Sequence, residues 1–136
     1  MKLQADRGNA AVEFIVVAVF LLIPICYSAI ACASAVNEYL TVNSAARNGA
    51  REFVLQADET SARAAALAQV RQQLAHAKLG NTTYSIQITC TEHPCFMPDG
   101  FVTLQVKGKR KFSVPLLGSV QIPISATQTL AIDTLR

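Results

Sequence analysis

The sequence predicts an α+β fold with a long N-terminal transmembrane helix, a second helix and a small antiparallel sheet of three to four strands. An uncharged apolar run extends from Phe14 to Val36, and a helical periodicity covers residues 61–78. Apolar and polar residues alternate after Gly80, as in half-buried strands. Helices followed by strands are typical of the α+β class.

The apolar run is the strongest of these signals. The chain is 51% hydrophobic and only 15% charged, whereas about a quarter of the residues in soluble domains are charged. As a helix, the roughly 23 residues of the run would span about 34 Å, more than the roughly 30 Å of a hydrocarbon core. We therefore expect residues 9–36 to form a transmembrane helix and residues 37–136 to form an extracytoplasmic domain.

The charges that flank the span favour an N-terminus in the cytoplasm. Lys2 and Arg7 precede the span, whereas Glu38 is the first charge after it and Arg47 the first basic residue. The apolar stretch is longer than that of a secretory signal peptide, so cleavage at the small residues 31–33 is a secondary interpretation. The expected location is the cytoplasmic membrane, with a single crossing and the C-terminal domain outside.

Beyond the span the helix is expected to continue to about Gln56. Ala45 with Gly49, and Ala46 with Ala50, are spaced by one helical turn. This spacing indicates either close-packing strips or simply an alanine-rich helix.

The second helix is predicted from about Ser61 to Lys78, with Asp58 or Thr60 as its N-cap. Its apolar face is expected to consist of Leu67, Val70, Leu74 and Ala77.

The strands are expected over residues 84–90, 102–106, 109–114 and 120–132, where the hydrophobic period is two. On the last strand the predicted apolar face consists of Val120, Ile122, Ile124 and Ala126.

The four cysteines fall into two pairs. Cys26 and Cys32 lie inside the apolar run and point to different helix faces, so we interpret them as small apolar side chains. Cys90 and Cys95 flank a short polar segment and are expected to form a disulfide, which implies an oxidising compartment. A metal site is the alternative, for which only His93 stands nearby as a further ligand.

Composition and motifs exclude several function classes. The net charge is only +3, and no aromatic-rich stretch interleaves with basic residues, so we expect no nucleic-acid partner. His76 and His93 have no serine, paired carboxylate or glycine-rich loop at a useful spacing. We therefore expect no enzymatic activity, no cofactor and no bound metal.

Glu13 is the informative residue, because it is a lone carboxylate at the start of the apolar helix. An ionised side chain deep in a bilayer costs about 2.5 to 3.5 kcal/mol on insertion scales. Either Glu13 lies at the interface and costs little, or it pairs with a cation in the membrane.

The residues before Glu13 favour the second interpretation. The order Arg7-Gly8-Asn9-Ala10-Ala11-Val12-Glu13-Phe14 resembles the class III signal of type IV pilins and pseudopilins. In that family a prepilin peptidase cuts after a glycine, and a glutamate stands fifth in the mature chain. The resemblance implies a leader of residues 1–8, cleavage between Gly8 and Asn9, and Glu13 as the fifth mature residue.

Cleavage would create the cation that Glu13 needs. A free α-amino group at Asn9 is mostly protonated at neutral pH, because its unperturbed pKa is about 7.7 to 8.0. Asn9 and Glu13 form an i, i+4 pair on one helix face. The carboxylate can therefore neutralise its own amino terminus or, as the family implies, that of a neighbouring subunit.

Later residues narrow the resemblance. Asn9 departs from the Phe or Met that is commoner at this place, as is normal in the tight-adherence branch. Residues 45–51 look like the small-residue-plus-arginine stretch of TadE-like proteins, and residues 112–118 and 124–127 resemble their C-terminal end. The chain thus resembles a TadE-like minor pilin or pseudopilin of the tight-adherence (Tad/Flp) pilus system.

This resemblance implies a type IV pilin-like fold and a structural function in assembly or at the tip of a pilus. The implied partners are other pilins or pseudopilins, the prepilin peptidase, the cytoplasmic membrane and the Tad secretion machinery. The alternative function is an uncut, single-pass, membrane-anchored adhesion or binding module of the cell envelope.

Overall fold

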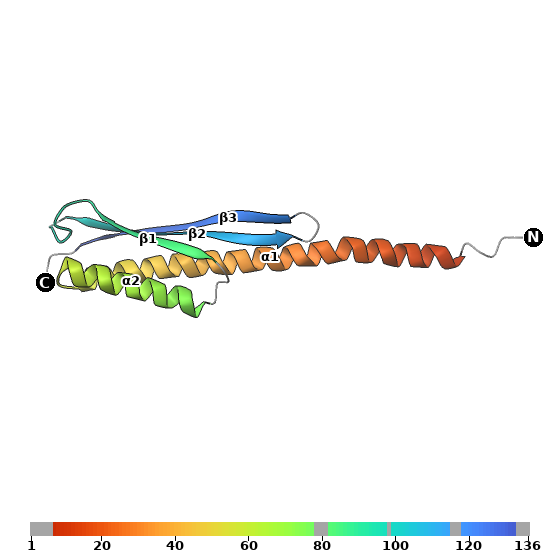
Figure 1. Ribbon diagram of the computed structural model, residues 1–136, viewed down its shortest axis with the longest axis horizontal. Helices are drawn as coiled ribbons and strands as arrows, with labels where there is room; N and C mark the ends of the chain where they lie inside the picture. Colours follow the sequence, from red (N-terminus) through yellow and green to blue (C-terminus); the bar gives the residue numbers. More distant parts are fainter. Residues whose placement is uncertain (1–6, 78–81, 98, 115–117, 133–136) are drawn as a thin grey trace, which may run out of the picture. The chain divides into compact units, whose positions relative to one another are not determined.

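The computed structural model describes residues 7–77, 82–97, 99–114 and 118–132. It confirms the α+β class, with a long apolar helix, a second helix and a three-stranded antiparallel sheet (Figure 1). The chain divides into two compact units, one ending at Val36 and the other beginning at Asn37. Helix α1 (Arg7–Leu55) contributes residues to both units.

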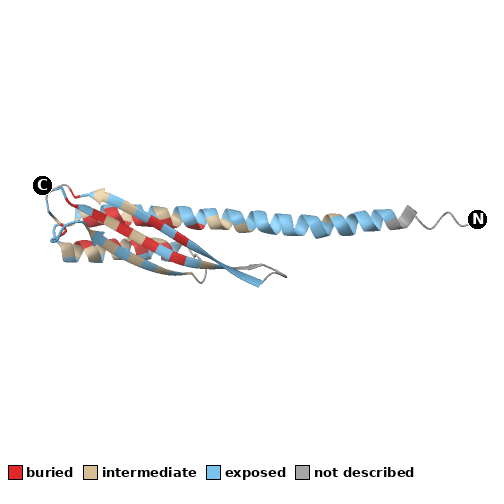
Figure 2. Cartoon of the chain, turned by 90° about the horizontal axis from the view of Figure 1, so that it is seen from above, coloured by how far each residue is buried: buried red, intermediate tan, exposed pale blue. Residues whose placement is uncertain are grey.

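The first unit is the apolar part of α1. Its large hydrophobic side chains are exposed from Val12 to Val36 (Figure 2). Among the described residues, α1 is the one helix long and apolar enough to cross a membrane. Pro24 lies inside α1 without ending it, as membrane helices tolerate.

The second unit consists of two layers. Residues 37–55 of α1 and helix α2 (Glu59–His76) form one layer. The sheet forms the other and contains β1 (Thr83–Cys90), β2 (Phe101–Val114) and β3 (Gly118–Ala131). The strands lie in the order β1-β2-β3, and each pair is antiparallel (Figure 1).

Helix α2 begins where a side chain satisfies its free N–H groups. Asp58 is the N-cap, as one of the two predicted candidates, and its carboxylate accepts a hydrogen bond of 2.9 Å from the N–H of Ser61. This hydrogen bond, followed by one from the Ser61 hydroxyl, lowers the pKa of Asp58. Capping of this kind stabilises a helix.

The buried face of α2 differs from the predicted one. Leu67 and Ala77, which we expected on it, are only half-buried. The buried residues recur at every fourth position and are Ala62, Ala66, Val70 and Leu74. Small side chains lie in the contact because α2 packs very closely on α1: a Cβ atom at Gly49 would lie 2.4 Å from Cγ2 of Val70. The small-residue spacing on α1 therefore reflects close packing.

β2 is one continuous strand, whereas we expected two strands over residues 102–106 and 109–114. Its pairing with β1 ends where Lys109 lies opposite Thr83, but its pairing with β3 continues to Val114 opposite Gly118. Residues 110–114 and 118–122 therefore form a two-stranded arm that extends past the end of β1.

The arm also explains a wrong prediction on β3. Ile124 and Ala126 are buried, but Val120 and Ile122 are 52% and 43% exposed. All of them share one face of the strand, and only the first pair lies over the core, because the second pair belongs to the arm.

The core of the second unit lies between the layers (Figure 2). β2 contributes alternate residues that are completely buried, Val102, Leu104 and Val106. The buried apolar residues of α1 are Val42, Ala45, Ala46, Ala50 and Phe53. The ring of Phe53 stacks on that of Phe96, with centroids 5.6 Å apart.

The outer face of the sheet, which points away from the helices, is polar. The hydroxyl oxygens of Thr103 and Thr129 lie 2.9 Å apart across the strands, and the Gln105 amide donates to the Thr127 hydroxyl at 3.0 Å. No Asp or Glu stands at an outer-face position of the described strands.

Candidate functional site

Glu13 lies in the first unit, within an apolar surface. The side chain is exposed, and so are its neighbours Val12 (59%), Phe14 (73%) and Ile15 (59%). In lipid such a carboxylate is stable at the interface or beside a cation.

The predicted cleavage position lies in the helical backbone, because α1 begins at Arg7 and so includes Gly8 and Asn9. The backbones of Asn9 and Glu13 are therefore separated by about one turn. This spacing would bring a new amino terminus at Asn9 close to the Glu13 carboxylate. Cleavage itself stays a prediction.

A second carboxylate, Glu38, lies at the beginning of the second unit and is completely buried. The Tyr84 hydroxyl donates to its Oε1 at 2.5 Å, and the Thr82 hydroxyl donates to the same atom at 3.2 Å. The guanidinium of Arg110 forms an ion pair with its Oε2. The Glu38 site thus joins α1 to both β1 and β2.

The ring of Tyr84 packs over Gly108 on the neighbouring strand, and its hydroxyl contacts Glu38. Tyr84 pairs with Gly108 in the sheet register, and a Cβ atom at Gly108 would lie 2.6 Å from the tyrosine ring. Burial, and then the hydrogen bond to Glu38, raise the pKa of Tyr84 above its ordinary value of 10.0. The hydroxyl therefore remains a donor at physiological pH.

Sequence reasoning missed the Glu38 site and treated Glu38 only as a charge that flanks the span. The available signal was its helical phase: Glu38 lies on the same face of α1 as the buried residues Val42, Ala45 and Gly49. A charged residue in phase with a buried stripe needs a partner across the core.

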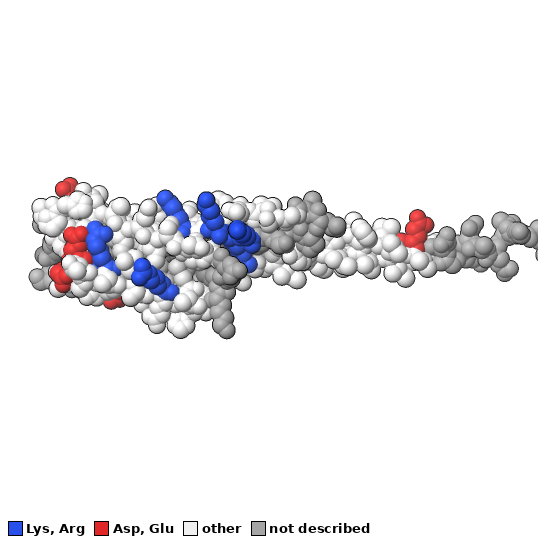
Figure 3. All heavy atoms as spheres, in the orientation of Figure 1, with Lys and Arg blue, Asp and Glu red and all other residues white. Residues whose placement is uncertain are grey.

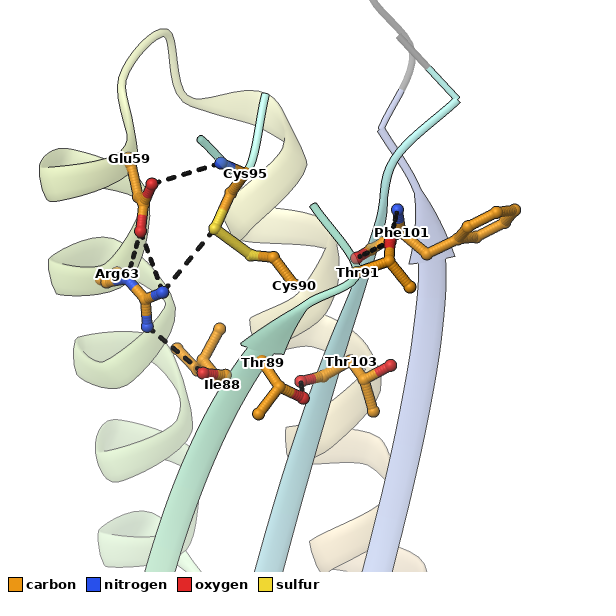
Figure 4. The surroundings of a disulfide bond; sticks show 9 residues. All are labelled: Glu59, Arg63, Ile88, Thr89, Cys90, Thr91, Cys95, Phe101 and Thr103. Carbon is orange, nitrogen blue, oxygen red and sulfur yellow. Dashed lines mark hydrogen bonds and ion pairs between the residues drawn. A yellow bond between two sulfur atoms is a disulfide. The ribbon is translucent and has the colours of Figure 1, made fainter. Parts of the chain in front are cut away.

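Cys90 and Cys95, the pair expected from the sequence, form a disulfide at the end of β1 (Figure 4). Two residues of α2, Glu59 and Arg63, form an ion pair of 2.9 Å beside this loop. Each of them also forms a hydrogen bond to the backbone near the disulfide. The Cys95 N–H donates to Glu59 at 3.3 Å, and Arg63 donates to the carbonyl oxygen of Ile88 at 3.2 Å. The hydrogen bond from Cys95, followed by that from Arg63, lowers the pKa of Glu59.

The metal alternative fits these residues poorly. Glu59, His93 and Cys95 bring possible ligand atoms within 4.8 Å of one another. However, the Cys95 sulfur belongs to the disulfide and offers no thiolate. The Glu59 carboxylate is already bonded to Arg63 and to the Cys95 N–H. The residues present therefore favour the disulfide.

Cys26 and Cys32 are free thiols on the exposed surface of α1. His76 and His93 are exposed. Among the described hydrogen bonds, none joins these cysteines or histidines to Glu13 or Glu38.

The comparisons with known proteins agree with the motif at the N-terminus. The model of the family described as TadE-like protein matches residues 8–51, from Gly8 through Glu13 to Arg51. No curated protein and no solved structure matches the chain. The resemblance that the Gly8-to-Phe14 motif predicted is thus confirmed over residues 8–51, the part of the chain that is similar to the TadE-like family.

Proposed function

We propose that the chain is a structural minor pilin or pseudopilin of a Tad-type pilus. A prepilin peptidase cuts it between Gly8 and Asn9, and residues 10–36 anchor it with the N-terminus toward the cytoplasm. The observation that carries this proposal is the TadE-like match, which begins at Gly8 and covers the apolar helix.

Cleavage prepares the anchor for assembly. Water adds across the Gly8–Asn9 peptide bond, which leaves a carboxylate on Gly8 and a protonated amine on Asn9. The amine of a neighbouring subunit can then pair with Glu13. Such pairing offsets the cost of a carboxylate in an apolar environment, about 2.5 to 3.5 kcal/mol at the centre of a bilayer helix.

The apolar surface of α1 suits two environments. The exposed hydrophobic residues between Val12 and Val36 can face lipid before assembly and the helices of other subunits after it. The second unit has its own core, to which α1 contributes buried residues from Val42 to Phe53. It can therefore keep its structure when the anchor changes environment.

Intact-mass measurement and N-terminal sequencing of the protein from cells that contain a prepilin peptidase test the proposal. We expect a mature chain that begins at Asn9, and a retained leader when the peptidase is absent. Gly8→Leu should block cutting, whereas Ala5→Leu, a similar change within the leader, should leave it intact. A mature chain that starts elsewhere contradicts the proposal, and a permanently uncut chain favours the membrane-anchored module.

Glu13→Gln separates cutting from assembly in the same experiment. This variant should still be cut but should enter the sheared-pilus fraction at least about tenfold less than wild type, because a charge pair worth a few kcal/mol is lost. Glu92→Gln removes a carboxylate from the exposed disulfide loop and serves as the matched control. Normal incorporation of Glu13→Gln would contradict the docking role.

A further inference from the structure

The arm extends toward the end of the second unit that contains its first residue, Asn37. A Cβ atom at Gly49 would contact Leu104, and further along β2 the side chain of Arg110 contacts Glu38. From Leu104 to Arg110, β2 therefore follows α1 backwards, from Gly49 to Glu38. The arm continues in this direction for roughly 13 Å beyond Arg110, at about 3.3 Å per residue.

Three lysines line the outer face of β2 near the arm. Lys107, Lys109 and Lys111 alternate along the strand and are all exposed. Figure 3 shows several basic side chains gathered toward this end of the second unit, whereas the acidic side chains visible on the same face of the unit lie toward its other end. No described carboxylate forms an ion pair with these lysines.

On the opposite face of the arm, β3 contributes the apolar residues Val120 and Ile122 beside the paired Arg110. Val120 and Ile122 expose about half of their surface, and neither belongs to the buried core. An element with lysines on one face and branched apolar residues on the other has the composition of an interfacial membrane segment. Lysine side chains are long enough to reach lipid headgroups while their strand lies at the surface.

We propose that the arm, with Lys107, Lys109 and Lys111, binds the anionic lipid surface of the membrane in which the chain is anchored. The proposal rests on the anchoring by residues 10–36 proposed above. It commits to lipid because the positive charge and the exposed apolar residues lie together at the anchor end of the domain. An acidic protein partner would explain the lysines but would leave Val120 and Ile122 facing water.

Hydrogen–deuterium exchange of the full chain in nanodiscs tests this contact. One set of discs contains phosphatidylcholine alone, and the other contains phosphatidylcholine mixed with phosphatidylglycerol. Many N–H groups of the arm point away from its paired strand, so they exchange quickly unless something covers them. We expect peptides covering residues 107–111 and 118–122 to exchange several-fold more slowly in the anionic discs, and salt to reverse the effect.

The combined variant Lys107→Gln, Lys109→Gln, Lys111→Gln should lose the protection, since each lysine near an anionic surface strengthens the contact by a factor of about five. The matched control Arg47→Gln, Arg51→Gln, Arg71→Gln removes the same charge from exposed helix positions and should keep it.

The outcomes separate this proposal from the anchoring beneath it. Slow exchange of α1 between Val12 and Ala33 in both kinds of disc reports anchoring. If α1 is protected but the arm exchanges equally in both discs, lipid binding is overturned while the anchor stands. If protection of the arm rises with the number of chains per disc instead of lipid charge, the arm contacts a second copy and the proposal fails. If α1 itself exchanges quickly, both proposals fail.

Discussion

Glu13 and Glu38 are carboxylates on the same helix in opposite surroundings. Glu38 is completely buried, and Arg110, Tyr84 and Thr82 all contact it. A buried carboxylate is tolerated when an ion pair and hydrogen bonds satisfy it together. Glu13 is exposed among apolar side chains. Glu38 thus finds its partners within the chain, whereas the proposed partner of Glu13 comes from cleavage.

Arg110→Met should destabilise the second unit by on the order of 2 to 4 kcal/mol, because it leaves Glu38 buried beside two hydroxyls without its cation. The Arg110 side chain is 25% exposed, so water will offset part of the loss. Urea unfolding of the full chain in detergent, followed by circular dichroism, measures the change.

Two further variants make this prediction specific to the pair. Glu38→Gln combined with Arg110→Met should recover much of the lost stability, because no buried charge then remains. Lys109→Met, at an exposed neighbouring position, should change stability by less than about 0.5 kcal/mol. Equal effects of Lys109→Met and Arg110→Met would show that the pair contributes little.

The two carboxylates differ in how far their roles can be predicted from the sequence. Glu13 belongs to a local motif, so the residues beside it suggest its role. The partners Glu38 and Arg110 are 72 positions apart, and their meeting depends on strand register, which no local pattern gives. The disulfide was predictable because Cys90 and Cys95 are close in sequence.

At the scale of elements, the contact of α1 with α2 and β2 depends on a missing side chain. A Cβ atom at Gly49 would lie 2.4 Å from Val70 on α2 and 3.0 Å from Leu104 on β2. Neither branched side chain has a flexible end that moves away without cost, so Gly49 sets the spacing of the layers.

Gly49→Ala should therefore destabilise the fold by roughly 1 to 2 kcal/mol. Alanine gains about 1 kcal/mol of helix propensity over glycine, but overpacking a core typically costs about 1 to 3 kcal/mol and is near the upper end at such short distances. Thermal unfolding of the full chain in detergent measures the balance.

The double variant with Val70→Ala provides the test of mechanism. In that background Gly49→Ala should become neutral or stabilising, because the methyl group nearest to the new Cβ is gone. Ser44→Ala, at an exposed position of α1, should show only a small effect. If Gly49→Ala is equally harmful with and without Val70, the close contact is not its cause.

The hydrophobic period predicted an element well where one of its faces packs on the core and the other faces solvent, as on β1. It failed on β2, where we expected two strands with an interruption between residues 106 and 109. The structure gives Gly108 another reason, since it leaves room for the Tyr84 ring. The arm was not predictable either, because the alternation of β3 continues past the point where β1 ends.

At the scale of the whole molecule, the four cysteines occupy different chemical environments. Cys26 and Cys32 are free thiols within the apolar helix, and Cys90 and Cys95 are joined in the second unit. A disulfide persists in an oxidising compartment. The redox state of Cys90 and Cys95 therefore reports on which side of the membrane the second unit lies.

Alkylation of thiols in acid-quenched cells, followed by mass spectrometry, measures this orientation. We expect Cys90 and Cys95 to resist alkylation until a reductant is added, because the proposed topology places them outside the cytoplasm. Prior reduction, which should label both, is the control for access to the reagent. Labelling of both residues without reduction would place the second unit in the cytoplasm and contradict the proposed orientation.

The cross-strand hydrogen bonds on the outer face of the sheet influence how this face of the second unit meets its surroundings. Thr103 forms a hydrogen bond with Thr129, and Gln105 forms one with Thr127. Some of the donors and acceptors of these side chains are therefore already paired within the sheet. A passing molecule would have to break those bonds, and displace the water held beside them, before gaining equivalent ones. This part of the sheet therefore favours a well-hydrated, weakly adhesive surface, which suits a chain whose proposed contacts lie at its helix and arm.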